Sequence, residues 1–464
     1  MDLRPEKPAS ATGRLIRPAL LPAQRSALKG AAVSSGLLLS ENVVRLASTA
    51  LISFWTARAL GPADFGTLMF ASALTAILFS LSTLGLEVPS VLRLARDKPP
   101  RDLLGTVLRL RLCAAVLACV AAVTAAMLVR PEHMQSQALT LIVALSLIGY
   151  APTVFDYAFK AQVRAGPPAL ARALTTLLSS GTKAAVLWHG GGLVEMAWTV
   201  VFEACLASLL LGLAWRRCGA PPGQGSRVAS MGFDRALAAR LLQQGLPLLA
   251  AGLATALHLK ADVVMLGRWA EASAAGQYAL AQKLSEILFV VPVVVVDSLY
   301  PLLARRQQEQ PGPRGHQPEA FSQQMFDLAL LSGALTALAV WMLAPVLIGW
   351  SFGKAYEGSV LLWQLLALTV PAVALDAARQ RWLVWQQQSH KAWQLAGAGA
   401  ALSLALNLLL IPQFGVQGAA LAAIVSWWTS ALLLPWLMPG LRPLAAMQCR
   451  ALWPFGRLRR GAVA

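Results

Sequence analysis

Charged residues are scarce in this 464-residue chain. Asp, Glu, Lys and Arg make up 13% of it and hydrophobic residues 57%, whereas an ordinary soluble domain carries about 25% charge. Several apolar runs exceed about 18 residues, the length that a helix needs to cross a bilayer. The short alternating segments typical of a membrane barrel are missing. We therefore expect an all-α polytopic membrane protein.

Sequence signals for catalysis are also lacking. The five cysteines follow no metal-binding or disulfide spacing. The chain has no phosphate-binding Walker motif, no cluster of metal ligands and no nucleophile elbow. The loops expected outside the cytoplasm are short, which leaves no room for a folded outer catalytic domain. We predict neither an enzyme nor a bound metal or cofactor.

What the chain does contain is twelve apolar segments. Their approximate limits are 31–59, 66–92, 107–129, 137–160, 169–189, 193–215, 241–268, 276–302, 322–350, 359–384, 392–411 and 416–438. Loops after even-numbered segments are rich in Lys and Arg, whereas loops after odd-numbered segments, such as 61–65, have few or none. Because basic loops favour the cytoplasm, both termini are expected there. The same bias explains the net charge of +18 without a nucleic-acid partner.

The long connection between the sixth and seventh segments divides the chain into halves. We predict a cytoplasmic N-terminal tail, a six-helix lobe, a cytoplasmic linker, a second six-helix lobe and a basic cytoplasmic tail, at 1–30, 31–215, 216–240, 241–438 and 439–464. Within the linker region, "FDRALAARLLQQ" at 233–244 is typical of an amphipathic helix lying at the membrane surface. Similar stretches at 60–74 and 266–284 follow the first helix of each half. Duplicated halves are common in transporters, with the binding site between them.

Charged side chains inside apolar segments cost about 2.5–3.5 kcal/mol each at a helix centre, so they tend to face a cavity or a partner. Glu41 and Arg45 are four residues apart and share one face of the first segment. They form either an internal ion pair or a cavity-lining pair in which Arg45 contacts an anion. Lys260 and Asp262 are two residues apart and point to different faces, so each needs another partner.

Further charges lie in the other segments. Lys283 and Glu286 share a face of the eighth segment, and Lys183 and Glu203 lie deep in the fifth and sixth. We predict that the substrate is bound by Arg45, Lys260, Glu41, Lys283 and Lys183. The candidates for a coupling-ion site are Asp262, Glu286, Asp297 and Glu203. Asp156 and Lys160, near a cytoplasmic end, are expected to pair in a packing role.

Three stretches resemble the Wzx-type polysaccharide flippases of the multidrug/oligosaccharidyl-lipid/polysaccharide (MOP) exporter superfamily. Residues 41–87 combine a polar first helix, a Leu-Gly-Pro link and a Phe-Gly pair. "GQYALAQKL" at 276–284 is similar to the start of that family's eighth helix. "NLLLIPQFGVQGAALAAIVS" at 407–426 is similar to its link between the eleventh and twelfth helices. These landmarks occur in the expected order over nearly the whole chain.

The resemblance implies two six-helix lobes around a central cavity that opens alternately to each side of a bacterial inner membrane. It implies carriage of an undecaprenyl-diphosphate-linked oligosaccharide for exopolysaccharide, capsule or O-antigen synthesis. The partners would be membrane lipids and the glycosyltransferases and polymerase of the same pathway. Coupling to H⁺ or Na⁺ is left open. From the internal repeat, Arg45 and Lys260 occupy roughly equivalent places in the two lobes.

Two other functions remain open from the sequence. A cation-coupled multidrug antiporter of the same superfamily would share the architecture and use Glu41, Asp262 and Glu286 to bind coupling ions. A membrane glycan polymerase or ligase would be expected to carry a large, Arg-bearing outer loop. The chain instead places its longest loops on the cytoplasmic side, which argues against the enzyme.

Overall fold

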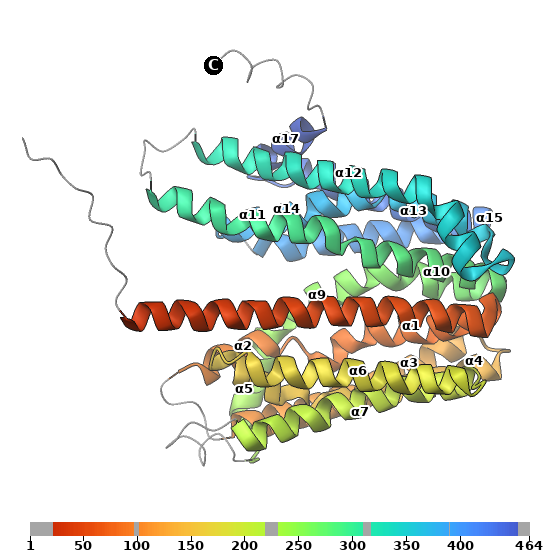
Figure 1. The fold of residues 1–464 in the computed structure, drawn as a ribbon, viewed down its shortest axis with the longest axis horizontal. Helices are drawn as coiled ribbons and strands as arrows, with labels where there is room; N and C mark the ends of the chain where they lie inside the picture. Colours follow the sequence, from red (N-terminus) through yellow and green to blue (C-terminus); the bar gives the residue numbers. More distant parts are fainter. Residues whose placement is uncertain (1–21, 97–101, 219–230, 310–316, 389, 453–464) are drawn as a thin grey trace, which may run out of the picture.

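The structure is a computed structural model that describes residues 22–96, 102–218, 231–309, 317–388 and 390–452, with backbone alone for 22–43, 300–309, 317–321 and 390. Within these ranges every regular element is a helix, and most helices run roughly parallel to one axis (Figure 1). The all-α prediction is confirmed.

The N-terminal lobe follows the predicted segments closely. Its helices are α1 (Pro22–Thr83), α2 (Glu87–Leu94), α3 (Leu103–Val129), α4 (Met134–Tyr150), η1 (Ala151–Val154), α5 (Phe155–Ala161), α6 (Gly166–Trp188) and α7 (Leu193–Cys218). Helix α1 contains the first two predicted segments, divided by a kink where Gly61 has φ of 73°. Glycine tolerates this left-handed conformation, and Pro62 cannot continue the preceding hydrogen-bond ladder.

The C-terminal lobe repeats this pattern. Its helices are α9 (Arg235–Trp269), α10 (Ala272–Leu288), α11 (Val290–Glu309), α12 (Gln317–Phe352), η2 (Lys354–Tyr356), α13 (Gly358–Ala367), α14 (Val370–Trp385), α15 (His390–Leu432), α16 (Leu434–Leu437) and α17 (Arg442–Ala451). Helix α15 is kinked at Gly415, with φ of 56°, between the two last predicted segments.

Nine helical stretches in the described part of the chain are long and apolar enough to cross a membrane. Two of them, Val44–Leu94 and Lys391–Leu432, each contain a kink that separates two predicted segments. Helix α6 accounts for the remaining predicted segment, since it carries Arg172 and Lys183 and is less apolar. Each of the twelve predicted segments thus corresponds to a helix, while the number that cross the membrane stays a prediction.

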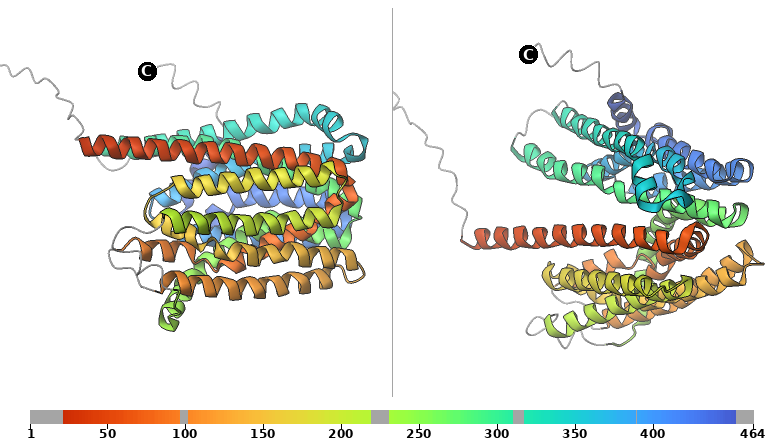
Figure 2. Two further views of the ribbon diagram at one scale, coloured as in Figure 1. Left: turned by 60° about the horizontal axis from the view of Figure 1, so that its bottom comes forward. Right: turned by 45° about the vertical axis from the view of Figure 1, so that its right-hand side comes forward.

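The lobes pack tightly at one end and diverge toward the other. At the end that holds Gly61 and Gly353, residues of both lobes form one buried cluster, which includes Phe65, Tyr278 and Tyr356. Tyr356 donates a hydrogen bond of 2.8 Å to the carbonyl oxygen of Ala57. At the other end α11 and α12 splay away from α1 (Figures 1 and 2). That end is the one predicted to be cytoplasmic.

The closest approach between the lobes is a glycine pair. A Cβ on Gly276 would lie 1.7 Å from the carbonyl oxygen of Pro62, and one on Gly66 would lie 2.6 Å from that of Ala272. No side chain fits at such separations, so glycine lets the backbones of α1 and α10 touch.

The start of α9 corrects one prediction. Residues 235–244 are not a separate surface helix, because they continue without a break into the spanning helix. Their apolar side chains, Leu237 and Leu241, are buried against Leu86 and Leu103 of the N-terminal lobe. Asp234 caps the helix by accepting hydrogen bonds from its first amides.

Candidate substrate cavity

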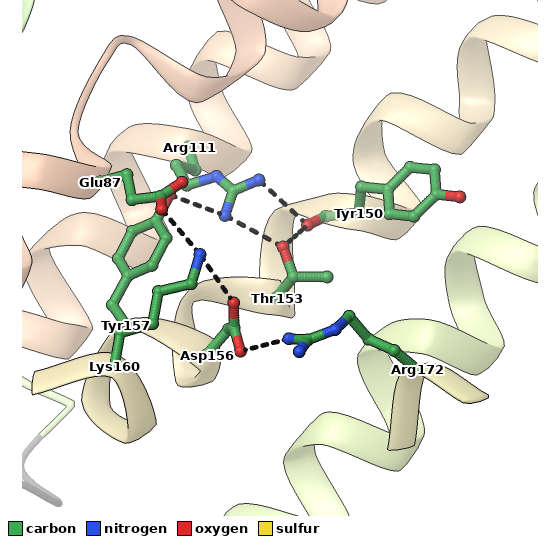
Figure 3. A network of polar contacts seen from close by, with 8 residues as sticks. All are labelled: Glu87, Arg111, Tyr150, Thr153, Asp156, Tyr157, Lys160 and Arg172. Atoms are coloured by element: carbon green, nitrogen blue, oxygen red, sulfur yellow. Dashed lines mark hydrogen bonds and ion pairs between the residues drawn. The ribbon is translucent and has the colours of Figure 1, made fainter. Parts of the chain in front are cut away.

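A buried arginine organises the polar interior of the N-terminal lobe. Arg111 of α3 is 2% exposed. Its guanidinium donates to Thr153 Oγ1 (3.1 Å), Tyr157 Oη (3.3 Å) and the Tyr150 carbonyl oxygen (3.2 Å), as Figure 3 shows. Tyr150 to Tyr157 span the junction of α4, η1 and α5, where the helix changes to a 3-10 turn. The Tyr150 carbonyl oxygen at this junction accepts hydrogen bonds from both Arg111 and Thr153 Oγ1.

A chain of ion pairs continues from this junction. Lys160 lies 2.7 Å from Glu87 and 3.0 Å from Asp156, whose other oxygen lies 3.0 Å from Arg172 (Figure 3). The predicted pairing of Asp156 and Lys160 is confirmed, but it belongs to a larger network. The network joins α2, α5 and α6.

These groups line a cavity of about 280 Å³. Its charged wall consists of Arg45, Glu87, Arg111, Asp156, Lys160, Arg172 and Glu203. Four of the seven are basic and three acidic. Arg45 comes from the exposed face of α1 and Glu203 from α7, so the helix that runs between the lobes (Figure 1) supplies one side of the cavity.

A second group of charges bridges the two lobes. Lys183 lies 2.5 Å from Glu203 in the N-terminal lobe, and Lys260 lies 2.6 Å from Glu286 in the C-terminal lobe. The ammonium group of Lys283 interacts electrostatically with both pairs. Glu203 therefore connects this lysine cluster, Lys183, Lys260 and Lys283, to the cavity.

The combined site carries more positive than negative charge. Seven basic and four acidic side chains belong to the cavity wall and the lysine cluster. The members of these two ion pairs, one in each lobe, have side chains that are 20–30% exposed, so they border accessible space and are not sealed in the core. An excess of Arg and Lys around a hollow suits a phosphate-bearing ligand.

Comparison with known proteins places the chain in a family. A family model described as "Polysaccharide biosynthesis protein" matches residues 34–307, more than half of the chain. The chain belongs to this family of polysaccharide biosynthesis proteins. No curated protein matches it in sequence.

Solved structures show the fold shared by this family member. The lipid II flippase MurJ in an inward closed conformation matches with a TM-score of 0.68 at 11% identity, over 90% of each chain. An inward-facing multidrug resistance MATE transporter of the MOP superfamily matches with a TM-score of 0.60 at 13% identity, over 90% of this chain and 96% of the other. A MATE transporter of Vibrio cholerae gives 0.53 at 13% identity, over 92% and 97%. The MOP-type fold expected from the resemblance is confirmed.

The predicted site residues of this polysaccharide biosynthesis protein fall into three groups. Lys183 pairs with Glu203 and Lys260 with Glu286, Lys283 lies within electrostatic range of both pairs, and Arg45 lines the adjoining cavity. The side chain of Glu41 lies outside the described residues. Asp262 and Asp297 lie elsewhere, and the expectation that Lys260 and Asp262 have separate partners is confirmed.

Asp262 sits in a closed polar pocket of the C-terminal lobe. It is 6% exposed and accepts hydrogen bonds from Tyr278 Oη (2.6 Å), Gln282 Nε2 (3.0 Å) and the Val263 amide (2.7 Å). Asp297 is half-exposed and lies 2.6 Å from Arg381, which joins α11 to α14. Neither carboxylate lines the cavity with Arg45, so their predicted role in ion coupling has no support from their position.

A much smaller cavity, about 50 Å³, lies inside the C-terminal lobe. It is lined by His258, Asp376, Arg379 and Trp427 among others. Asp376 pairs with Arg379, and the His258 ring lies 4.3 Å from that of Trp427. This space is too small for a sugar and is separate from the lysine cluster.

Arg111, Arg172 and Glu87 were missed by the sequence analysis. Arg111 lies about one turn inside the predicted apolar segment 107–129, so the cost of an intramembrane charge would have singled it out. Arg172 and Glu87 lie near segment ends, where a charge commonly faces water. Only the fold shows that they meet Lys160 and Asp156.

Removing the buried guanidinium should destabilise the N-terminal lobe. We expect Arg111→Met to lower the free energy of unfolding by about 2–3 kcal/mol, because Tyr150 O and Thr153 lose a charged donor in a buried site. Arg109→Met, two residues away on the exposed face, should change it by less than about 0.5 kcal/mol. Thermal unfolding of the purified proteins measures the difference, and equal midpoints would contradict a structural role for Arg111.

Proposed function

We propose that this chain is an alternating-access flippase for an undecaprenyl-diphosphate-linked oligosaccharide in a bacterial inner membrane. The carrying observation is the basic excess of the site: Lys183 and Lys260 each pair with one glutamate, and Lys283 lies within electrostatic range of both pairs. Arg45 lines the cavity that Glu203 also lines. Membership in a polysaccharide biosynthesis family supports a glycan substrate. The fold shared with a lipid II flippase supports a lipid-linked one.

The chemistry of such a substrate fits this site. A lipid diphosphate is anionic, and Arg and Lys donors hold phosphate oxygens by charge-assisted hydrogen bonds. Tyr150, Thr175 and Thr176 of the cavity wall offer groups that can bond sugar hydroxyls. The polyprenyl chain stays in lipid, since its transfer into a polar cavity would cost the hydrophobic free energy of each methylene.

The divergence of the lobes indicates from which side of the membrane the substrate is expected to enter. The described helices spread apart at the end predicted to be cytoplasmic (Figure 2), where glycan is assembled on its lipid from cytoplasmic precursors. In this state the diphosphate would reach the lysine cluster from the cytoplasmic leaflet. Closure there and opening of the glycine-lined end would release it outside.

Coupling to H⁺ or Na⁺ is part of the proposal. Glu203 and Glu286 each form an ion pair with one lysine. When a diphosphate takes over these lysines, the two carboxylates become available to a cation or a proton. Substrate and coupling ion would thus exchange partners at a shared site.

The test is complementation in the native host. Deletion of the gene should leave undecaprenyl-diphosphate-linked intermediates in the inner leaflet and remove surface polysaccharide, and wild type should restore both. Arg45→Ala should restore export at about one tenth of the wild-type rate, the effect of losing about 1.4 kcal/mol of interaction. Arg58→Ala, exposed on the same helix and away from the cavity, serves as the matched control.

Three results would argue against this function. Unchanged surface glycan and intermediates after deletion, in a host without a second flippase, would refute the polysaccharide substrate. Resistance to cationic dyes on expression would favour the multidrug antiporter instead. Glycosyl transfer by the purified protein would support the alternative function of a membrane glycan polymerase or ligase.

A further inference from the structure

A groove lies at the predicted cytoplasmic edge of the seam between α2 and α9, apart from the cavity described above. It has a volume of about 720 Å³ and is lined by Val88, Pro89, Leu92, Arg93, Arg96, Leu237, Arg240, Gln244, Pro247 and Leu248. The set consists of three arginines, one glutamine and six apolar residues. No acidic side chain lines it.

Within the described residues, none of the ion pairs involves Arg93, Arg96 or Arg240. Arg93 Nη2 donates to Gln244 Oε1 at 3.0 Å, which fixes the guanidinium across the seam. Its Nη1 atom is buried and has no hydrogen-bond partner among the residues that the structure describes. A buried donor without an acceptor is costly, so this atom indicates that an acceptor from outside the chain belongs there.

The apolar part of the groove faces outward along the bundle. Leu92 is 64% exposed, Val88 52% and Leu248 41%. On a membrane-spanning bundle such side chains face acyl chains, while the arginines mark the level of the headgroups. A ligand that fits must have a phosphate beside a hydrocarbon chain.

We infer that this arginine groove binds the headgroup phosphate of an anionic phospholipid of the cytoplasmic leaflet, with an acyl chain along Leu92 and Leu248. Basic pockets between helices at that leaflet are suited to anionic headgroups. Because Arg93 and Gln244 belong to α2 and α9, the bound lipid stabilises the seam that joins the start of α9 to the N-terminal lobe. The site is separate from the proposed transport path and does not depend on it.

The experiment measures lipid binding by native mass spectrometry of the full-length protein in detergent. Wild type is titrated with phosphatidylglycerol, with phosphatidylcholine and with inorganic phosphate. Phosphatidylglycerol should bind at least tenfold more tightly than phosphatidylcholine, and inorganic phosphate should not bind. In Arg93→Gln/Arg240→Gln the affinity for phosphatidylglycerol should be about 30-fold weaker, given the contribution of each basic residue near an anionic headgroup.

Arg216→Gln/Arg217→Gln is the matched control, since it removes the same charge from an exposed helix end outside the groove. It should bind phosphatidylglycerol as wild type does. If the groove variant is poorly folded, Arg96→Gln, at the exposed rim, should still weaken binding about fivefold. If the groove variants and the control bound phosphatidylglycerol with equal affinity, the proposed lipid site would be wrong. Tighter binding of undecaprenyl diphosphate than of phosphatidylglycerol at these arginines would overturn the phospholipid assignment.

Discussion

Cells that carry Lys260→Glu should lose export of surface polysaccharide by about 100-fold or more, with normal amounts of protein in the membrane. The change removes a cation from the lysine cluster and places two carboxylates, at 260 and 286, where an ion pair of 2.6 Å stood. A charge-assisted contact is worth roughly 1.5–3 kcal/mol, and repulsion of an anionic substrate adds to its loss. Export is measured as surface glycan per cell, and protein by immunoblot.

Exchanging the charges of Lys260 and Glu286 distinguishes a role of Lys260 in substrate binding from a role in helix packing. Lys260→Glu/Glu286→Lys restores an ion pair between α9 and α10 with reversed polarity. If Lys260 serves only to hold these helices together, the swap should restore export. Because we place Lys260 at the diphosphate, the swap should restore thermal stability and leave export at least tenfold below wild type. Full rescue would remove Lys260 from the substrate path.

Adding one methyl group at Gly276 should disrupt the tight end of the molecule. The new Cβ in Gly276→Ala would lie 1.7 Å from the Pro62 carbonyl oxygen, and a backbone atom cannot rotate away as a flexible side chain can. The helices α1 and α10 must separate, at a cost of about 3 kcal/mol. We expect a clear fall in the thermal unfolding midpoint. We also expect increased reactivity of a cysteine placed at the buried position of Ala57, in a background without native cysteines.

Gly397→Ala is the control for this substitution. No atom lies within 4 Å of a Cβ at Gly397, and the residue is in a regular part of α15. The alanine should leave stability unchanged or raise it by up to about 1 kcal/mol, the difference in helix propensity. Equal stability of the two variants would show that the lobes do not depend on this contact.

Much of the fold was predictable because lipid imposes strict rules on a chain. Backbone groups in a bilayer must bond within their own helix, so long apolar runs had to be helices, and Gly61 and Gly415 divided them where expected. The start of α9 could not be assigned from the pattern alone. Leu237 and Leu241 form an apolar face both on a helix at the membrane surface and on a helix packed against protein. Whether that face contacts lipid or protein depends on the positions of α2 and α3.

The sequence predicted which charged residues belong to the site better than it predicted which of them form ion pairs with one another. The cost of a buried charge singled out Lys183, Glu203, Lys260 and Glu286. Spacing placed Lys283 and Glu286 on one face of α10, and in the structure Glu286 forms an ion pair with Lys260 of α9. Whether two charged side chains on different helices form an ion pair depends on how those helices pack. The distance between the helices cannot be read from a single sequence. For Asp262 the cost of burial did not reveal the partners, because the uncharged side chains of Tyr278 and Gln282 donate to its carboxylate.

The attachment of α9 to the N-terminal lobe has a consequence for how the protein is made. Gly85 and Gly245 approach so closely that a Cβ on either would lie 2.4 Å from a backbone oxygen of the other's segment. The amide of Asp234 donates a hydrogen bond of 3.0 Å to Thr106 Oγ1 of α3. As the ribosome extends the chain, the first six helices therefore remain incomplete until residues 231–245 have emerged. A half-protein that stops at residue 218 would leave Leu86 and Leu103 uncovered, and one that stops after Gly245 would not. Gene fusions and split versions of this protein should place their junction after the first turns of α9.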